Sequence, residues 1–423
     1  MGRAGTFFTV TWANQPTFQN PPLQVWIVGR SHQLFGEGDF AARLPSLLMA
    51  LATLGLTYGI GCRLLDPSAA LTGVAMLLIT PLFVDGARRC MMEVPLTFWA
   101  CLAMFIVVAG IKRPRIHVLL AVPLAAAILT KSVMGLLPLL IVAVAGFAAH
   151  YRPLVRNPWL WLGAALGLAA GASWTLHQWM TLGREAVAAH YLGEIAARSM
   201  GDASLIDLIA GYPLILLRDF QPLVLPGLVG AFVMAGAGRR KARPEQLLLV
   251  IWVLLPIVLY SFSGARSSRY IFPILPAMAL CGGAWLREVV PRFTEILTAR
   301  LAPAVAVACA VVFMVSPGLL TRDLNRGFKE NAVALQDLIP ADEPLSYLGD
   351  QYWEFANPLL YYAERLLATP AATPQAALDD ASRRRVRLVL WDRDRLAELE
   401  AVAPLARRVL EGPRWVLVQT PQR

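Results

Sequence analysis

The sequence has 423 residues, of which 57% are apolar and only 16% are charged. This apolar fraction is larger than a soluble chain of that length needs to form its core. The composition therefore predicts a membrane protein with several transmembrane spans. The formal net charge of +10 is the excess of Lys and Arg that keeps short loops on the cytoplasmic side, which argues against nucleic-acid binding.

The first 43 residues precede the first predicted span. They contain the stretch NPPL at 20–23, and residues 1–23 have no apolar run long enough for a signal peptide. We therefore predict an external N-terminal segment over 1–43.

Apolar runs of about 17 to 25 residues then recur along the chain, as expected of transmembrane helices. Ten candidate spans are found, at 44–62, 68–84, 94–111, 116–131, 134–150, 158–177, 213–235, 246–262, 270–286 and 301–318. They predict an all-α polytopic membrane domain over 44–318.

Basic residues gather at every second connection and set the orientation. These cytoplasmic loops are 112–115, 151–156, 239–243 and 287–300. The alternate connections are then external; they are 85–93, 132–133, 178–212 and 263–269. An even number of spans and an external C-terminal tail require an external N-terminus, yet no span precedes residue 23 to carry it across. The expectation is that a first helix is missing, through truncation or a misplaced start; the alternative is that the first span is miscounted.

The character of the sequence changes after the last span. An amphipathic helix is predicted over 327–340 and another helix over 394–402, with short strands at 345–348, 386–390 and 415–418. A small soluble α/β domain over 319–423, external to the membrane, is predicted from this pattern.

Charged residues break the apolar pattern at the external ends of the spans. A cation at membrane depth costs about 2.5 to 3.5 kcal/mol unless it is paired or reaches the lipid headgroups. Several cations on one face indicate an anionic ligand such as phosphate, since Arg offers a bidentate fork and Lys a point charge. The alternative is snorkelling to headgroups. The residues concerned are Arg88, Arg89, Glu93, Lys131, Arg266 and Arg269.

Four motifs carry a family resemblance. They are FQNPPLQVWIVGRSHQLFGEGDFAARLPSLLMAL at 18–51, GARRCMMEVPLTFW at 86–99, ILTKSVMGLLPLL at 128–140 and FSGARSSRYIFPILPAMAL at 262–280. In this order they resemble bacterial GT-C-class glycosyltransferases of the protein mannosyltransferase and lipid A aminoarabinose transferase superfamily.

The resemblance implies an inverting glycosyltransferase of the bacterial inner membrane. Its donor would be a polyprenyl-phosphate-linked sugar, and its acceptor a lipid, a glycan or a protein at the outer face of the membrane.

Two departures from the family pattern affect the expected site. The acidic pair of the first external loop has no counterpart, because the chain begins about twenty residues before NPPL. The Lys of the family's KPPL is Asn20 here, and an amide can donate to phosphate but carries no charge.

Glu93 is then the first catalytic candidate, with Asp85 as the second. The resemblance assigns the donor phosphate to Lys131 and Arg269, with Arg266, Asn20 and Arg88 as further contacts. Glu93 has a structural alternative, since a carboxylate in the first turn of a helix is stabilised by the positive end of the helix dipole.

Two other readings remain open. His177 and His190 could contribute to a divalent-metal site, but they lack H-x-x-x-H spacing and a carboxylate at ligand spacing, so no cofactor is predicted and a metal is left as an alternative. The chain could also be a degenerate non-catalytic relative, or a protein that binds or transports lipid-linked sugars. A transporter would more often show internal repeats, which are not seen.

Overall fold

The structure is a computed structural model. It describes residues 8–12, 15–16, 20–185, 187–188, 205–237, 246–263, 266–301, 303–304, 307, 326–350, 352–385, 387–404 and 406–420. The chain divides into two compact units, Met1–Val311 and Val312–Arg423.

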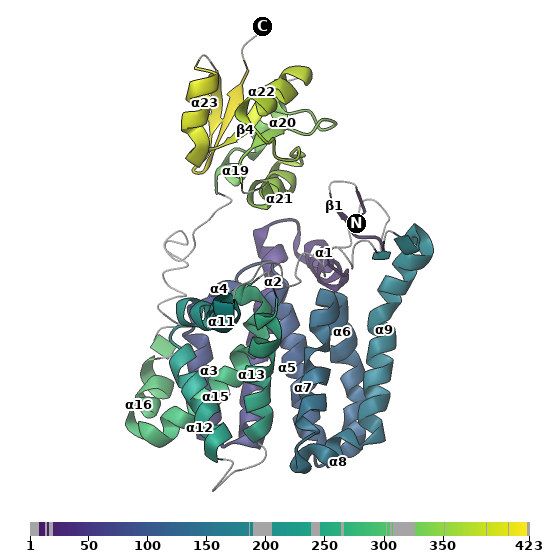
Figure 1. The fold of residues 1–423 in the computed structure, drawn as a ribbon, viewed down its shortest axis with the longest axis vertical. Helices are drawn as coiled ribbons and strands as arrows, with labels where there is room; N and C mark the ends of the chain where they lie inside the picture. The colour runs from purple at the N-terminus through teal and green to yellow at the C-terminus, as the bar shows by residue number, and fades with distance from the viewer. Residues whose placement is uncertain are drawn as a thin grey trace. The chain divides into compact units, whose positions relative to one another are not determined.

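The first unit is helical apart from a two-stranded ribbon (Figure 1). Its elements up to residue 155 are β1 (Thr11–Trp12), β2 (Gln15–Pro16), α1 (Leu23–Phe35), α2 (Asp39–Leu64), α3 (Pro67–Leu78), α4 (Pro81–Ala87), α5 (Glu93–Gly110), η1 (Pro114–Leu120), α6 (Ala121–Lys131), η2 (Ser132–Leu136), α7 (Leu137–Ala145), η3 (Ala149–Tyr151) and α8 (Arg152–Val155). Its later elements are α9 (Pro158–Leu182), α11 (Leu205–Asp219), α12 (Val224–Ala237), α13 (Leu247–Ser261), α14 (Ser268–Ile271), η5 (Phe272–Ile274), α15 (Leu275–Val289), α16 (Pro291–Ile296) and η6 (Leu297–Leu301).

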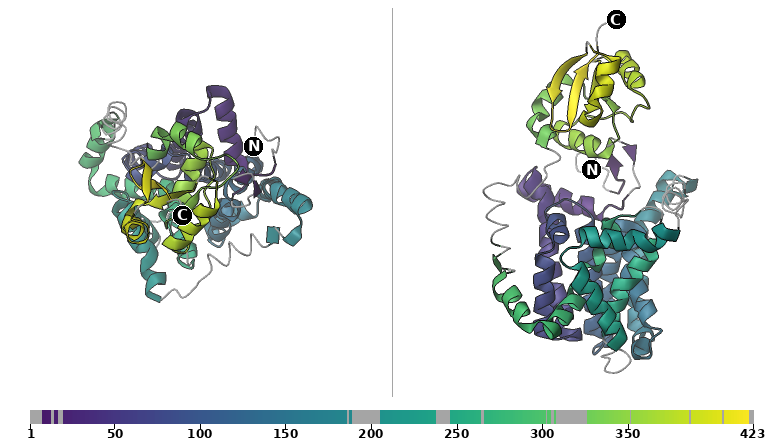
Figure 2. Two further views of the ribbon diagram at one scale, coloured as in Figure 1. Left: turned by 90° about the horizontal axis from the view of Figure 1, so that it is seen from above. Right: turned by 60° about the vertical axis from the view of Figure 1, so that its left-hand side comes forward.

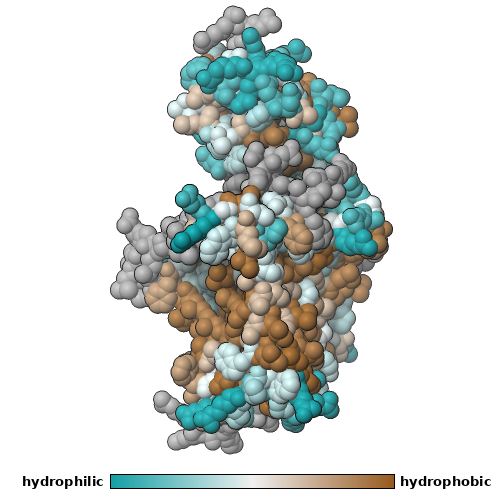
Figure 3. Space-filling model, turned by 90° about the vertical axis from the view of Figure 1, so that its right-hand side faces the viewer, coloured by the Kyte–Doolittle hydropathy of each residue, from teal (hydrophilic) through white to brown (hydrophobic). Residues whose placement is uncertain are grey.

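The predicted membrane domain is confirmed in its helical character and apolar surface. Within the described residues, five helical stretches are long and apolar enough to cross a membrane, or six if α3 and α4 count as one span. Apolar side chains cover the middle of the helical unit, and hydrophilic ones its ends, on the face shown in Figure 3. These features are typical of a multi-pass membrane protein.

Two helices form the centre of this unit. In the most apolar 18 residues of each span, the buried share is 78% for the span that contains α15 and 72% for α5. The corresponding share is only 33% for α2 and for α9. Small residues allow the central helices to approach closely: a Cβ on Gly283 would lie 2.5 Å from the carbonyl oxygen of Ala69 on α3. The outer helices α2 and α9 therefore present most of their surface to lipid.

The predicted tight turn at 132–133 is confirmed. Ser132 adopts a left-handed backbone conformation, with φ of 44°, directly after α6. A Cβ on Gly135 would overlap the backbone of Ala127 and Ile128, eight and seven residues earlier, so the chain folds back on α6. The apolar stretch Pro114–Ala145 is thus a helical hairpin, in which η2 packs back on α6 and leads into α7.

Two of the predicted spans are wrong as continuous helices. The span at 213–235 is divided, because α11 ends at Asp219 and α12 begins at Val224. Pro222, which has no backbone N–H to donate, lies in the break between the two helices. The span at 68–84 bends by 70° between α3 and α4, where Pro81 starts the second helix. Most of the tenth predicted span, 301–318, lies outside the described residues.

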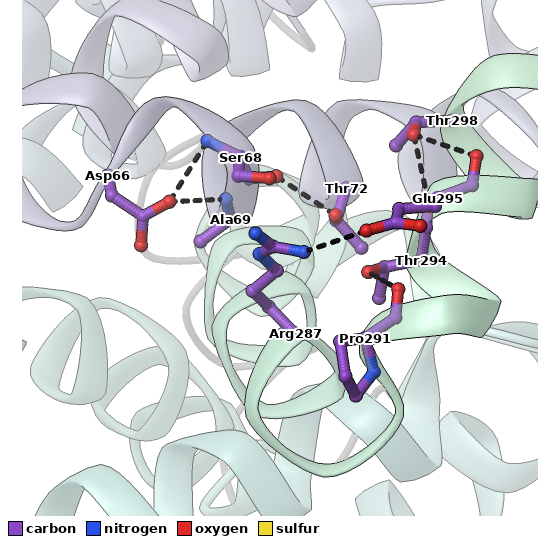
Figure 4. A network of polar contacts seen from close by, with 9 residues as sticks. All are labelled: Asp66, Ser68, Ala69, Thr72, Arg287, Pro291, Thr294, Glu295 and Thr298. Carbon is purple, nitrogen blue, oxygen red and sulfur yellow. Dashed lines mark hydrogen bonds and ion pairs between the residues drawn. The ribbon is translucent and has the colours of Figure 1, made fainter.

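A polar network holds the turns at one end of the bundle (Figure 4). The Asp66 carboxylate accepts hydrogen bonds from the backbone amides of Ser68 and Ala69 and caps the start of α3. Arg287 at the end of α15 lies 3.8 Å from Glu295 on α16. Arg287 belongs to one of the basic loops predicted to be cytoplasmic, so this end is expected to face the cytoplasm.

The second unit is a small α/β domain (Figure 2). Its elements are α19 (Arg326–Glu330), α20 (Ala332–Leu338), β3 (Ser346–Leu348), α21 (Tyr352–Ala363), α22 (Pro374–Arg383), β4 (Leu388–Asp392), η7 (Arg393–Arg395), α23 (Leu396–Val402), β5 (Arg407–Glu411) and β6 (Trp415–Gln419). They include the predicted helices and strands, with a break at Asn331 in the first helix. The strand β5 was not predicted.

The sheet has the order β3-β4-β6-β5, with β3 and β4 parallel and the other neighbours antiparallel. The central strands β4 and β6 are buried and apolar, and Leu390 pairs with Leu417 between them. A polar contact ties β3 to α22: Ser346 donates to the Asp380 carboxylate at 2.6 Å, and Arg384 donates to the same carboxylate at 2.9 Å.

Candidate active site

The predicted site residues lie on elements that meet at one end of the helix bundle. We call it the site end; it carries the first residues of α2 and α5, the last residues of α6, and the helices α1, α4 and α11 that lie across the bundle (Figure 1). It is opposite to the end that contains Asp66 and Arg287.

The structure joins two of the predicted residues in one ion pair. Lys131 Nζ lies 2.9 Å from Glu93 Oε1, with 14% and 9% of the two side chains exposed. Glu93 starts α5, and Lys131 ends α6 just before the reversal at Ser132. The turn of the hairpin therefore positions the ammonium group against the carboxylate.

An aromatic side chain borders this pair. The Lys131 ammonium lies 5.7 Å from the ring centroid of Tyr270 on α14, within cation–π range. Tyr270 in turn lies beside Tyr260 on α13, with 6.2 Å between ring centroids. The pair from α5 and α6 thus contacts the 262–280 motif, far away in the sequence.

Asp85 belongs to a second cluster, at the end of α4. Its two carboxylate oxygens lie 3.0 Å from Arg88 Nη2 and 2.7 Å from Arg89 Nε. The carboxylate is thus engaged by two guanidinium groups, which neutralise it. Asp85 is therefore a weaker candidate than Glu93 for taking a proton from a substrate.

The two arginines of the 262–269 loop differ in their surroundings. Arg269 is exposed, and its backbone amide donates to the Ser267 hydroxyl, which caps α14. Arg266 is partly buried and lies against Gly211 of α11, where an added Cβ would stand 2.7 Å from Arg266 Cδ. The sequence had given Arg269 the larger role.

Sequence reasoning missed Tyr212, which is completely buried beside Arg266. Burial raises the pKa of the Tyr212 phenol to about 12, while the Ser267 backbone and the Arg266 guanidinium act in the opposite direction. The signal in the sequence was weak: a single tyrosine between Gly211 and Pro213 at the edge of a predicted span.

The NPPL stretch leads directly into α1. Asn20 is half-buried just before that helix. Four residues later Gln24 is 4% exposed, and its amide atoms have no hydrogen-bond partner among the described residues. A buried glutamine on α1, which packs against α2 and α6, is a second residue that sequence reasoning missed.

No set of metal ligands is found in the described part of the chain, where no group of three or more His, Cys, Asp or Glu could hold an ion. His177 packs against Phe8, with ring centroids 5.2 Å apart. His190 lies outside the described residues.

The arrangement combines groups suited to acyl, phosphoryl or glycosyl transfer to or from an anionic substrate. A nearly buried carboxylate can accept a proton, and cationic groups close to it can stabilise charge that develops on a departing oxyanion. The apolar helices around them exclude water, which strengthens both effects.

Comparison with known proteins places part of the membrane unit in a known context. Residues 19–177 match the family model of the dolichyl-phosphate-mannose-protein mannosyltransferases. This stretch contains Asn20, Asp85, Glu93 and Lys131.

An undecaprenyl phosphate-alpha-4-amino-4-deoxy-L-arabinose arabinosyl transferase of Pectobacterium carotovorum is 25% identical over 66% of this chain and 51% of its own length. An uncharacterized protein of Aquifex aeolicus is also 25% identical, over 68% of this chain and 57% of its own length. The chain spans about half the length of the curated relatives that it matches.

Solved structures show the same fold. The crystal structure of ArnT from Cupriavidus metallidurans bound to undecaprenyl phosphate aligns over 99% of this chain and 92% of its own, with a TM-score of 0.69 and 20% identity. The apo oligosaccharyltransferase of Archaeoglobus fulgidus aligns over 90% of this chain and 62% of its own, with a TM-score of 0.56 and 12% identity.

Proposed function

We infer that this chain, a GT-C glycosyltransferase family member, transfers a sugar from a polyprenyl-phosphate-linked donor to a lipid, glycan or protein acceptor. The observation that carries the proposal is the Glu93–Lys131 pair at the site end, within the stretch that matches the mannosyltransferase family. The names of the relatives, which act on or bind undecaprenyl phosphate or its sugar derivative, support this donor. The site end is proposed to face the outer side of the inner membrane, as is the C-terminal domain.

In the proposed reaction the acceptor oxygen attacks the anomeric carbon of the sugar. The bond from that carbon to the phosphate oxygen breaks, the polyprenyl phosphate leaves with the electron pair, and inversion results. Glu93 takes the proton of the acceptor, and cations stabilise the charge on the departing phosphate. An arriving phosphate would compete with Glu93 for the Lys131 ammonium and so release the carboxylate for this role.

A specific observation supports a second candidate function. The ion pair occupies both the carboxylate and the ammonium group, so a chain that keeps this pair closed would bind lipid-linked sugars without transferring them. The two candidates make different predictions for the fate of a labelled sugar.

The test is a transfer assay with the purified chain, a radiolabelled undecaprenyl-phosphate-linked sugar and bacterial membrane lipids as acceptor. Transfer by the parent and a loss of about 100-fold or more in Glu93→Gln are expected, which is the usual contribution of a general base. Asp85→Asn, the matched carboxylate variant, should keep most of the activity.

Full activity of Glu93→Gln would contradict the proposed role of this carboxylate. Binding of the labelled donor by the parent without any transfer would favour the second candidate.

A further inference from the structure

One long stretch of the membrane unit carries cations without any acidic residue. Residues 94–183 contain six Lys and Arg residues and no Asp or Glu. One of the six, Lys131, lies at the site end and pairs with Glu93. The other five lie around η1 and α8, at the end of the bundle opposite to the site end (Figure 1). We call them the basic patch; they are Lys112, Arg113, Arg115, Arg152 and Arg156.

The charges of the basic patch are not neutralised within the described part of the chain. All five residues are exposed, and none of them forms an ion pair with another described residue. Five neighbouring cations repel one another unless an anion lies between them. The patch therefore favours an anionic ligand from outside the chain.

A buried side chain holds the two halves of the basic patch together. Asn157, which is 9% exposed, donates a hydrogen bond of 3.1 Å from its amide nitrogen to the carbonyl of Pro114. Its amide oxygen accepts from the backbone N–H of Trp159 at 3.2 Å, at the start of α9. Because Pro114 stands between Arg113 and Arg115, the segments 112–115 and 152–156 are fixed next to each other before any ligand arrives.

Aromatic and apolar side chains border the patch. Trp159 and Trp161, on the first turn of α9, are 38% and 46% exposed, and Phe147, just before η3, is 85% exposed. The Trp161 indole donates to the carbonyl of Val155 at 2.6 Å. Exposed tryptophans that end an apolar span are typical of the level of the lipid headgroups. A small soluble anion would gain nothing from these apolar surfaces, whereas a lipid contacts them with its acyl chains.

Another basic loop at the same end differs in its charge balance. The loop 287–300 has three cations but also two acids, Glu288 and Glu295. Arg287 of this loop lies 3.8 Å from Glu295. Both loops satisfy the preference for positive charge on the cytoplasmic side. That preference alone does not explain five exposed cations without one acid.

We propose that the basic patch binds the headgroups of anionic phospholipids in the leaflet on its side of the membrane, the cytoplasmic leaflet in the orientation given above. Arg and Lys donate charge-assisted hydrogen bonds to the phosphate oxygens, and the exposed aromatic residues contact the acyl chains. A zwitterionic headgroup also has a phosphate, but the cations of the patch repel its ammonium group. The site lies at the other end of the bundle from the Glu93–Lys131 pair and does not depend on the proposed sugar transfer.

The experiment measures equilibrium binding of radiolabelled phosphatidylglycerol to the purified full chain in a maltoside detergent. Radiolabelled phosphatidylcholine is the zwitterionic reference. The parent should bind phosphatidylglycerol at least about tenfold more tightly, since each basic residue near an anionic lipid surface contributes roughly a fivefold factor. The double variant Arg113→Gln/Arg156→Gln takes one charge from each half of the patch and should lower the affinity for phosphatidylglycerol by about tenfold or more.

The matched control is Arg287→Gln/Arg292→Gln, which also removes two charges at this end but leaves the patch intact. It should bind phosphatidylglycerol within about twofold of the parent, a small fraction of the tenfold effect. Thermal unfolding of both double variants shows whether they remain folded. Equal losses in the two would mean that total charge decides binding, and the patch would not be a site.

Two further measurements can overturn the proposal. Equal affinity of the parent for phosphatidylglycerol and phosphatidylcholine would exclude recognition by charge. At about 1 M salt, where the Debye length is only about 3 Å, the preference should largely disappear. Inorganic phosphate at the same concentration as the lipid should not displace it, and efficient displacement would show a site for a free anion instead.

Discussion

Single residues matter most where a charge is buried, and the Glu93–Lys131 pair is the main example in the membrane unit. Both side chains are nearly buried, so removing one leaves the other without its partner in an apolar environment. Removing one member of a buried pair costs about 3 to 5 kcal/mol, whereas replacing both by apolar residues is often neutral.

We therefore expect Lys131→Met to lower the stability of the chain by about 3 kcal/mol. Glu93→Leu should do the same, and the double variant should recover most of the loss. Thermal unfolding in detergent gives the three values, and their difference is the coupling energy of the pair. Additive losses in the double variant would mean that the two side chains do not interact in the folded protein.

Asp380 gives the C-terminal domain a predictable response to acid. Burial alone would raise the pKa of Asp380, but hydrogen bonds from Ser346 and Arg384 outweigh it and hold the pKa below the ordinary value of 3.8. A group whose pKa is lower in the folded state stabilises the fold at neutral pH. That contribution is lost as the pH falls through 3.8 to the lower pKa of the folded state.

Asp380→Asn should thus destabilise this domain by about 1 kcal/mol at pH 7, a modest value because the pair is partly exposed. The difference from the parent should shrink below about pH 4. Unfolding followed by tryptophan fluorescence from pH 7 to pH 3 measures it, with Asp379→Asn as the exposed neighbouring control. A difference that is constant with pH would rule out this role for the Asp380 carboxylate.

Among the elements, the α6–α7 hairpin depends on one small residue. Gly135→Ala should destabilise the membrane unit by about 1 to 3 kcal/mol, because its Cβ would overlap the backbone of Ala127 and Ile128. Gly55→Ala on α2 is the control, since nothing lies within 4 Å of the added Cβ, and it should be neutral or stabilising. Equal thermal stability of the two variants would contradict the tight hairpin.

The helices and strands could be predicted where a single sequence pattern, such as a long apolar run, was enough to assign them. The apolar runs predicted α2, α5 and α9, and the buried stretches LVLW and WVLV predicted β4 and β6. The division between α11 and α12 was missed, because its apolar residues continue on both sides of the break. The edge strand β5 was missed because its two arginines are exposed, so the strand lacks the alternation of apolar and polar residues that predicts a strand.

The site could be predicted only as a set of residues. Sequence position and charge made Glu93, Lys131 and Arg266 candidates, but neither reveals that Glu93 and Lys131 form one pair. Pairing depends on how α5 packs against α6, which the spacing of residues does not encode. Tyr212 and Gln24 were missed because an isolated polar residue in an apolar stretch gives no signal of its own.

For the molecule as a whole, the alternation of basic loops predicts how it lies in the membrane. Lys241→Cys should be labelled only from the cytoplasmic side and Asp350→Cys only from the outside, in a background without the native cysteines. Position 241 lies outside the described residues, and Asp350 follows β3 in the C-terminal domain. Labelling of both from the same side would contradict the proposed orientation and the external position of the site end.

Phe8 joins parts of the chain that are made at very different times. Trp174 and Gln178 of α9 both donate hydrogen bonds of 2.8 Å to its backbone carbonyl, across 166 and 170 residues of sequence. At about 5 to 20 residues per second, a ribosome needs roughly 10 to 30 s to add that much chain. During that interval the carbonyl of Phe8 must find other partners, so the segment around Phe8 reaches its final place only after α9 has been made.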